Sequence, residues 1–200
     1  MSLTFRPCIL IPCYNHGAMM ANVLTRLAPF QLPIIVVDDG SDTSTRQTLD
    51  QLATDNAHVT LVRLTHNAGK GAAVIRGLKV CAGAGYTHAV QVDADGQHAI
   101  EDIPQLLALA ERHPQALISG QPIYDDSIPR SRRYGRWVTH VWVWIETLSL
   151  QLKDSMCGFR VYPVAPTLQL VNRVSLGKRM DFDTEVMVRL YWQGHTSYFL

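Results

Sequence analysis

Short apolar runs and helical segments alternate strictly through the first 120 residues. The apolar runs have the length and β-branched character of buried strands, and they span Pro7 to Ile11, Pro33 to Val37, Val59 to Leu64 and Thr87 to Val92. Segments with helical spacing follow at Met19 to Leu27, Ser44 to Thr54, Gly71 to Cys81 and Ile100 to Arg112, before a further strand at Ala116 to Ser119. This alternation predicts an α/β fold with a mainly parallel sheet. Ligands bind such sheets outside the carboxyl ends of the strands.

The chain changes character after Gly120. A polar stretch at Tyr124 to Ser127 leads into a basic run, and an apolar, aromatic segment then extends from Trp137 to Leu152. A helix is expected near Asp183 to Trp192. With 200 residues, 47% of them hydrophobic and 18% charged, the chain can bury the core of one domain. We therefore predict a single domain, 1–200, in which residues 121–200 elaborate the alternating half at 1–120.

Bulk charge and cysteine usage narrow the class of protein. The formal net charge of +1 predicts no nucleic-acid partner. The four cysteines form no CxxC pair and no zinc-type spacing, and the start lacks a signal-peptide pattern, which favours a cytoplasmic location. No run reaches the roughly 18 apolar residues of a membrane-spanning helix, so any membrane contact is expected to be peripheral. The strand-like ending at Tyr198 to Leu200 is compatible with a chain that continues further.

Two carboxylates stand two residues apart where the fourth apolar run ends. Because strand side chains repeat every two residues, Asp93 and Asp95 are expected to point the same way and to share one hard divalent cation. Gly96 allows the chain to turn, and Gln97 offers a neutral oxygen ligand. This set suits Mg²⁺ or Mn²⁺ with open positions for phosphate oxygens. The alternative is an acidic loop that only turns the strand, since the motif is short.

Polar sequences also follow the first two strands, at Ile11 to Asn15 and Val36 to Ser41. Both fall on the predicted ligand edge of the sheet. Tyr14 can pack on a nucleotide base, and Asp39 can accept hydrogen bonds from a base or a ribose hydroxyl. Asp39 equally suits a turn or a helix N-terminus.

The third strand leads into a glycine-rich turn, His66 to Gly71, that opens a helix. Free backbone N–H groups at this helix start, together with Lys70, are candidates to hold phosphate. The turn has neither the GxxxxGK[ST] spacing of the P-loop nor the third glycine of the dinucleotide fingerprint. A plain helix-capping turn is the alternative interpretation.

Five motifs in order, PCYN, VDDGS, NAGKG, DADGQH and DSMCGFR, resemble the family 2 glycosyltransferases with the GT-A fold. The similarity is to the dolichyl-phosphate mannose synthase and polyprenyl-phosphate sugar transferase branch, and it covers the chain from about Pro7 to the end. It implies a GT-A-type, Rossmann-like, three-layer α/β/α domain. It also implies that Asp93, Asp95 and Gln97 hold a metal on the sugar-nucleotide diphosphate. By the same resemblance, the residues that line the nucleotide are Pro12, Tyr14, Asn15, Asp39 and Lys70.

The resemblance assigns sugar-nucleotide binding to residues 1–120 and acceptor binding to residues 121–200. Asp154 to Arg160 resembles the D-x-(T/S)-x-G-F-R segment of the family, with Cys157 where serine is frequent. This departure leaves no hydroxyl at that position. Guanidinium groups pair well with phosphate, so the candidates to grip an acceptor phosphate or the donor diphosphate are Arg130, Arg132, Arg133, Arg136 and Arg160. A solvated basic loop is the alternative for at least two of them.

The segment from Trp137 to Leu152 is rich in tryptophan and leucine and follows the basic run. Tryptophan favours the boundary between lipid headgroups and hydrocarbon, so a peripheral contact with the inner face of the membrane is one interpretation. A core helix or an oligomer contact is the other. A lipid-linked acceptor favours the first.

We therefore predict a metal-dependent, inverting glycosyltransferase that moves a sugar from a UDP- or GDP-type donor to a lipid-linked or glycan acceptor. Lys70 and a metal held through Asp95 are expected to stabilise the departing nucleoside diphosphate. A hydroxyl acceptor would need a carboxylate base, for which Asp154 comes first and Asp181 or Asp183 second. A polyprenyl phosphate is already anionic and needs a base less.

Two other functions compete with this prediction. A nucleotidyltransferase or other sugar-nucleotide enzyme would also need paired acids above a parallel sheet, but PCYN is not the glycine-rich loop it would want after the first strand. A catalytically silent nucleotide-binding scaffold is the other alternative. The intact Asp93, Asp95 and Lys70 argue against it.

Overall fold

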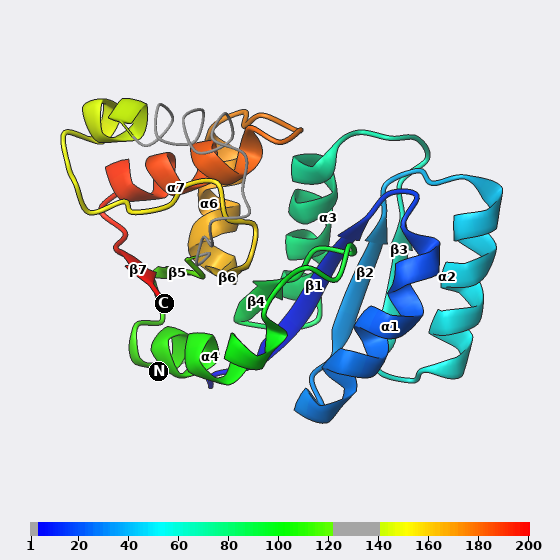
Figure 1. Ribbon diagram of the computed structural model, residues 1–200. Helices are drawn as coiled ribbons and strands as arrows, with labels where there is room; N and C mark the ends of the chain where they lie inside the picture. The colour runs from blue at the N-terminus through cyan, green and yellow to red at the C-terminus, as the bar shows by residue number, and fades with distance from the viewer. Residues whose placement is uncertain (1–3, 122–140) are drawn as a thin grey trace, which may run out of the picture.

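The computed structural model describes residues 4–121 and 141–200. Within these residues, seven strands form one sheet in the order β3-β2-β1-β4-β6-β5-β7 (Figure 1). Neighbouring strands are parallel except where β6 pairs with β4 and β5, so the predicted mainly parallel sheet is confirmed. The strands are β1 (Pro7–Cys13), β2 (Ile34–Asp38), β3 (Val59–Arg63), β4 (His88–Gln91), β5 (Leu117–Ser119), β6 (Arg160–Pro163) and β7 (Ser197–Phe199).

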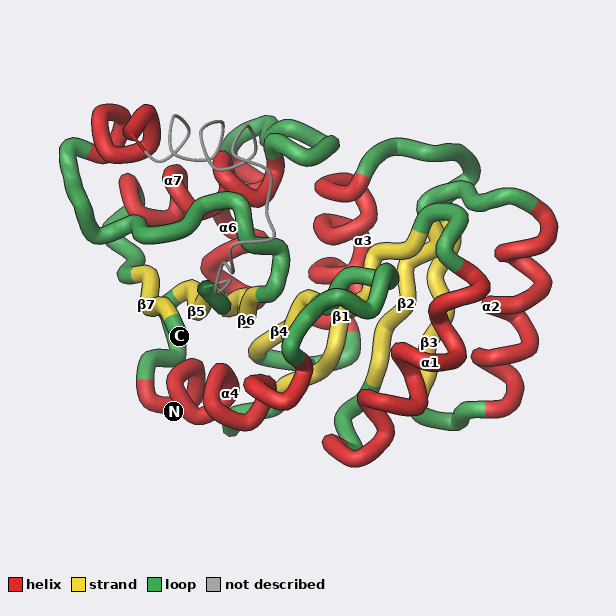
Figure 2. The backbone as a smooth tube through the Cα atoms, viewed as in Figure 1, coloured by secondary structure: helices red, strands yellow, loops and turns green. Residues whose placement is uncertain are grey.

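Helices cover both faces of this sheet (Figure 2). One face carries α1 (Gly17–Leu27), α2 (Thr43–Asp55) and α4 (Ile103–Arg112), and the other carries α3 (Lys70–Gly83), α6 (Val164–Arg173) and α7 (Phe182–Trp192). Short 3₁₀ turns occupy Ala28–Phe30 and Ile100–Asp102. Residues 141–147 are also helical. The three-layer α/β/α arrangement is therefore confirmed.

The surroundings of β1 explain why its sequence is a continuous apolar run. Cys8 and Leu10 pack with the core under α3, α6 and α7, whereas Ile9 and Ile11 pack with the core under α1 and α4. A strand that is covered on both faces needs an apolar side chain at every position. The period-2 alternation of a half-exposed strand is consequently absent.

Two elements of the second half, β6 and α6, were not predicted. β6 begins with Arg160 and ends with Pro163, so its four residues carry no apolar run. It is nevertheless wholly buried between β4 and β5. α6 has Pro166 in its first turn, where proline is tolerated but disguises the start of the helix.

The order of the strands places a crevice at one edge of the sheet. β1 lies between β2 and β4, so the chain moves to one side of β1 through β2 and β3 and returns to its other side at β4. Sheets of this type bind ligands outside the carboxyl ends of the strands at such a reversal. Here these ends lead into Tyr14 and into the pair Asp93 and Asp95.

The start of α3 packs directly against the start of α7. A Cβ atom at Gly71 would lie 2.6 Å from Cβ of Phe182 and 2.9 Å from the carbonyl oxygen of Gly177. At the other end of α3, a Cβ atom at Gly83 would meet nothing within 4 Å.

We predict that Gly71→Ala lowers the free energy of unfolding by about 1–3 kcal/mol, because the added methyl group must displace packed backbone or the base of a buried ring. Gly83→Ala is the matched control in the same helix. Because alanine has a higher helix propensity than glycine, Gly83→Ala should leave the free energy of unfolding unchanged or raise it by up to about 1 kcal/mol. Urea denaturation measures the free energy of unfolding of both variants, provided that their m-values equal that of the parent protein. Equal effects of the two substitutions would contradict the close packing of α3 on α7.

Candidate active site

A cleft of about 600 Å³ lies at this edge of the sheet. Its walls come from the segments after β1, β2 and β4, from the start of α3 and from the loop before α7. The structure thus brings four of the sequence motifs to one place. The predicted site residues that line the cleft are Pro12, Tyr14, Asp39, Lys70, Asp93 and Asp95.

The loop after β4 is held in a sharp turn. Gly96 has φ +72°, in the left-handed region that favours glycine. Arg26 of α1 donates hydrogen bonds to the carbonyl oxygens of Gly96 (2.8 Å) and His98 (3.3 Å). Oδ1 of Asp95 accepts the backbone N–H of Gln97 at 3.0 Å. The turn therefore presents Asp95 to the cleft on a loop that is fixed to α1.

Asp93 and Asp95 fit part of the predicted metal site. Both line the cleft, but Gln97 is exposed and does not line it. Over residues 4–121 and 141–200, no group of three or more His, Cys, Asp or Glu side chains is placed to hold a metal ion. Two carboxylates leave most positions of an octahedral cation to other oxygens, such as those of a diphosphate. The donor set thus suits Mg²⁺ or Mn²⁺ as a partner of a bound diphosphate.

Asp39 holds the glycine-rich turn in place. Its Oδ1 and Oδ2 accept the backbone N–H groups of Ala68 (2.8 Å) and Gly69 (2.9 Å). The N–H of Ala72 donates to the carbonyl oxygen of Lys178 at 3.2 Å. The expectation that the turn offers free N–H groups to phosphate is therefore wrong at these three positions. Asp39 still lines the cleft, and each carboxylate oxygen keeps lone-pair capacity for a ribose hydroxyl.

Asn15 has a structural role that the sequence did not reveal. Its Oδ1 accepts the backbone N–H of Asp42 at 2.8 Å, and its own N–H donates to Oγ of Ser41 at 3.0 Å. Asn15 joins the loop after β1 to the segment before α2. It does not line the cleft, so its predicted contact with the nucleotide has no support in this geometry.

Lys70 carries its charge between two carboxylates. Its Nζ lies 2.9 Å from Oδ2 of Asp93 and 3.1 Å from Oδ2 of Asp183, which α7 provides. Burial alone lowers the pKa of Lys70, but the charges of Asp183 and Asp93 more than offset this, so its pKa lies above the ordinary value. Lys70 is therefore a permanent cation that already has two anionic partners.

A closed ring of five side chains contains this pair of contacts. Nε2 of Gln91 donates a hydrogen bond to Oδ1 of Asp93 at 3.2 Å. The Tyr162 hydroxyl lies 3.3 Å from Oε1 of Gln91 and 3.4 Å from Oδ1 of Asp183. Lys70 closes the ring between Asp183 and Asp93. Burial, followed by the charge of Asp183, raises the pKa of Tyr162, so the hydroxyl keeps its proton and can donate it.

Gly158 covers the ring from the loop before β6. A Cβ atom at this position would lie 2.6 Å from Lys70 Nζ, 2.9 Å from Asp93 Oδ2 and 3.0 Å from Gln91 Nε2. The glycine of the GFR segment is therefore required for the close approach of backbone to charge. The second half of the chain contacts the cleft residues directly here.

The predicted contact of Arg160 with phosphate has no support in this geometry, because Arg160 does not line the cleft. Its side chain is completely buried, and it donates hydrogen bonds to the carbonyl oxygens of Asp183 and, at 2.6 Å, of Ser155. Sequence alone predicts that an arginine at the start of a short strand has an exposed side chain. Here it ties the loop before β6 to the start of α7.

Asp154 is also buried and does not line the cleft. Its Oδ1 accepts the backbone N–H groups of Met156 (2.8 Å) and Cys157 (3.2 Å), which shapes the turn before Gly158. The role of catalytic base thus finds no support in this geometry.

His98 supports the loop that carries Asp93 and Asp95. Its Nδ1 accepts the backbone N–H of Asp93 at 3.2 Å, and its ring stacks on Phe159 with 5.0 Å between centroids. Burial lowers its pKa, so the ring is neutral at pH 7.

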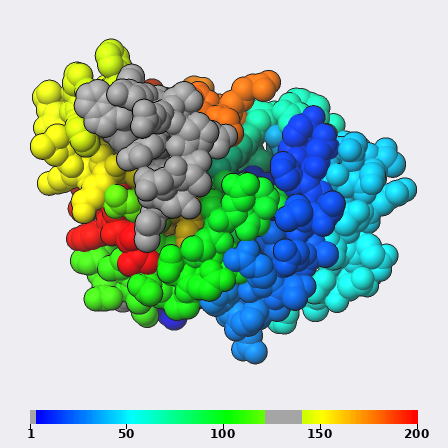
Figure 3. Space-filling model, viewed as in Figure 1, coloured from blue at the N-terminus to red at the C-terminus, as the bar shows by residue number. Residues whose placement is uncertain are grey.

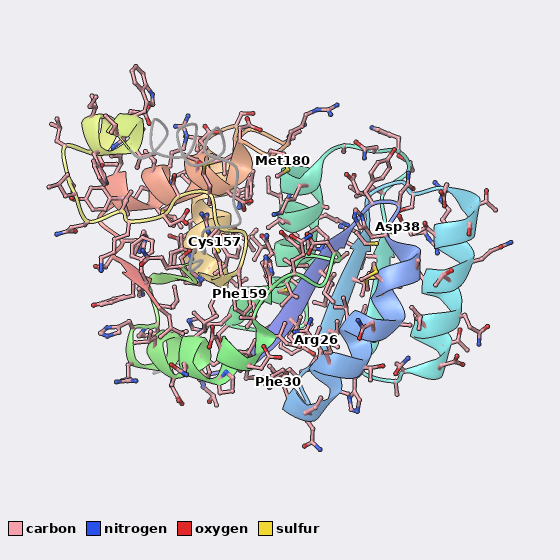
Figure 4. All side chains as sticks on the ribbon, viewed as in Figure 1. Arg26, Phe30, Asp38, Cys157, Phe159 and Met180 are labelled. Atoms are coloured by element: carbon pink, nitrogen blue, oxygen red, sulfur yellow. The ribbon has the colours of Figure 1, made fainter. Side chains whose placement is uncertain are left out.

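Arg179 and Met180 line the cleft, although no sequence pattern had indicated them. Their loop lies on the glycine-rich turn, since a Cβ atom at Gly69 would overlap the carbonyl oxygen of Lys178. Figure 3 shows this orange segment beside the cyan-green start of α3, and Figure 4 labels Met180 at the same place. The N–H of Arg179 donates to Oδ1 of Asp181 at 3.2 Å. Two basic residues before a helix are too common a pattern to have indicated a site.

Several predicted residues lie outside the described residues. They are Arg130, Arg132, Arg133 and Arg136, together with Trp137. Within residues 4–121 and 141–200, none of the helices combines the length and the apolar character needed to cross a bilayer.

The sheet, the reversal of strand order and the acidic cleft together define an α/β enzyme of the GT-A glycosyltransferase class. The chain belongs to glycosyl transferase family 2, whose model matches residues 8–179. A solved structure of S. aureus TarS 1-349 in complex with UDP-GlcNAc shares the fold, with a TM-score of 0.69 at 17% identity, over 98% of this chain and 56% of that one. The nucleotidyltransferase and silent-scaffold alternatives are set aside by this family membership.

Several relatives are named for polyprenyl-phosphate substrates. An undecaprenyl-phosphate mannosyltransferase of Micrococcus luteus is 32% identical over 82% of this chain and 68% of its own length. A UDP-N-acetylglucosamine–dolichyl-phosphate N-acetylglucosaminyltransferase of Methanococcus voltae is 33% identical over 90% of this chain and 78% of its own length. A polyprenol monophosphomannose synthase of Mycolicibacterium smegmatis is 38% identical over 52% of this chain, which spans 40% of that relative.

We predict that Arg160→Lys lowers the free energy of unfolding by about 2 kcal/mol or more, because lysine cannot reproduce both charge-assisted hydrogen bonds to buried carbonyl oxygens. Arg179→Lys, at the exposed loop, should leave stability within about 0.5 kcal/mol. Thermal or urea unfolding separates the two. An Arg160→Lys protein of unchanged stability would restore a role for Arg160 in ligand binding.

Proposed function

We propose that this glycosyltransferase moves a sugar from a nucleoside-diphosphate donor to a polyprenyl phosphate, with inversion at the anomeric carbon and with the help of a divalent cation. The observation that carries the proposal is the composition of the cleft. Tyr14, Asp39, Lys70, Asp93 and Asp95 line one cleft. We assign Tyr14 and Asp39 to the nucleoside and the other three residues to the diphosphate. An aromatic ring and hydrogen-bond acceptors suit a nucleoside, whereas a lysine and metal-binding acids suit a diphosphate.

The reaction can be written with the residues at hand. An oxygen of the acceptor phosphate attacks the anomeric carbon, the bond from that carbon to the β-phosphate oxygen breaks, and the nucleoside diphosphate leaves. Attack from the face opposite the leaving group gives inversion. The attacking oxygen is already anionic, so no base is required. This agrees with the buried position of Asp154 and with the pairing of Asp183 with Lys70.

The leaving group gains negative charge as the bond breaks. Lys70 is fixed as a cation beside this position, and such preorganised charge favours the transition state. A Mg²⁺ or Mn²⁺ ion on Asp93 and Asp95 would add Lewis-acid stabilisation of the same oxygens.

An exposed apolar face supports the choice of a lipid-linked acceptor. In the helix at residues 141–147, Val143 is buried, whereas Trp142 is 61% exposed and Ile145 is 59% exposed. Leu148 (93%) and Leu150 (74%), which follow this helix, are also exposed. Exposed apolar side chains that are close together in the chain suit a peripheral contact with a bilayer. The names of the relatives point to the same class of acceptor.

Asp95→Asn should lower kcat/KM for sugar transfer by about a hundredfold or more, since it removes one of two charged metal ligands. The assay offers UDP- and GDP-sugars with Mn²⁺ and undecaprenyl phosphate, and it follows the glycolipid product by mass spectrometry. Asp55→Asn, on the exposed end of α2, is the matched control and should keep full activity.

The acceptor has its own control, which is the polyprenol of equal length without phosphate. Transfer to the phosphate alone supports the proposal. Transfer to the free alcohol would require a base and would overturn the proposed acceptor, and full activity of Asp95→Asn would overturn the metal site.

The double variant Trp142→Ser/Ile145→Ser should lower partitioning onto vesicles that contain anionic lipid by about tenfold, because it removes two apolar side chains from the exposed face. Co-sedimentation measures the change. Met19→Ser, at a partly exposed position on α1, serves as the control. Equal partitioning of all three proteins would contradict the membrane contact.

A further inference from the structure

The ring of five side chains that includes Lys70 extends beyond the cleft. Lys70 and Asp93 line the cleft, whereas Gln91, Tyr162 and Asp183 do not. The side chain of Asp183 is only 4% exposed, and Tyr162 is completely buried. Burying a carboxylate and a hydroxyl is costly unless each has partners, and here the partners are one another and Lys70.

Lys70 and the proposed divalent cation compete for the carboxylate of Asp93. Its Oδ2 is 2.9 Å from Lys70 Nζ, yet the proposed function uses the same carboxylate to hold a divalent cation. A cation on Asp93 and the ammonium of Lys70 repel each other, so Lys70 must move away from Asp93 when the site is loaded. A half-buried ammonium that loses one counter-ion needs another.

Asp183 is placed to be that counter-ion. It lies 3.1 Å from Lys70 Nζ and belongs to α7, whereas Asp93 follows β4. Two neighbours keep it in position: the Tyr162 hydroxyl lies 3.4 Å from its Oδ1, and Arg160 donates to its backbone carbonyl oxygen. Asp183 therefore stays fixed while the contact between Lys70 and Asp93 opens.

We propose that Asp183 and Tyr162 are positioning residues that hold the Lys70 ammonium in the cleft while Asp93 exchanges it for a divalent cation. The inference rests on the proposed function and deepens it. In the ligand-free ring, Lys70 takes the place of the cation at Asp93. After the exchange, Asp183 keeps Lys70 beside the diphosphate.

The proposal predicts how charge on Asp183 affects metal binding. Asp183→Asn leaves Asp93 as the single carboxylate partner of Lys70 within the ring, so Lys70 competes more strongly with the cation. Mn²⁺ affinity, measured by electron paramagnetic resonance with UDP or GDP present, should fall about tenfold. In a Lys70→Met background the same substitution should change the affinity by less than about twofold.

This double-mutant cycle separates positioning from simple electrostatics. Loss of a nearby negative charge would weaken Mn²⁺ binding by the same factor with or without Lys70. Equal factors in both backgrounds would therefore overturn the proposal.

Tyr162→Phe tests the same idea without altering any charge, and it serves if Lys70→Met folds poorly. It removes the hydroxyl that holds Asp183 and should lower Mn²⁺ affinity about threefold. Tyr198→Phe, on β7 and away from the ring, is the matched control and should leave the affinity unchanged. Parent-like affinity in Tyr162→Phe would count against the role of the ring.

Kinetics give a second readout that a merely structural defect would not reproduce. In Asp183→Asn, the Mn²⁺ concentration for half-maximal transfer should rise about tenfold, and kcat at saturating Mn²⁺ should stay below the parent value because Lys70 is no longer held beside the diphosphate. A Mn²⁺ requirement equal to that of the parent protein would overturn the proposal. A parent protein that transfers no sugar and binds no Mn²⁺ with either nucleotide would instead refute the proposed function, and the inference would fall with it.

Discussion

Lys70 forms ion pairs with Asp93 and Asp183, which come from opposite halves of the chain. Asp93 follows β4 in the alternating half, and Asp183 belongs to α7 near the end. Charges this close to the core need partners at short range, because burial without them is expensive. The contact therefore fixes the distance between α3, the loop after β4 and α7. Gly71 and Gly158 reflect the same constraint, since each lies where a side chain would collide with one of these elements.

The antiparallel strand β6 explains how the second half reaches the cleft. It pairs with β4 through four register positions, from His88 with Pro163 to Gln91 with Arg160. This register sets Tyr162 beside Gln91 and brings the preceding loop over Asp93. The second half thus contributes strands to the central sheet, and the proposed acceptor half is continuous with the donor half.

Several polar residues stabilise loops although their motifs indicated ligand contact. Asp39 accepts two backbone N–H groups, Asn15 connects the loop after β1 to the segment before α2, and Arg160 is buried against carbonyl oxygens. A polar residue in a binding motif can serve the ligand directly or the loop that surrounds it. Sequence spacing does not distinguish these roles, because both put the residue at the same edge of the sheet.

The sequence by itself determined the alternating half: buried strands read as continuous apolar runs, and the carboxyl ends of parallel strands must meet at one edge. That rule alone predicts that Tyr14, Asp39, Lys70, Asp93 and Asp95 lie together, and all five line one cleft. Only the tertiary structure decided which partner each charge takes. Asp183 is about a hundred residues from Lys70 in the chain, and no periodicity links them. Strand β6 escaped detection for a related reason, since its arginine is acceptable in the core because the carbonyl oxygens of Ser155 and of Asp183 in α7 accept its hydrogen bonds. Local pattern fixes which faces of a segment are buried, whereas the pairing of polar groups across those faces depends on contacts that form only when the whole chain has folded.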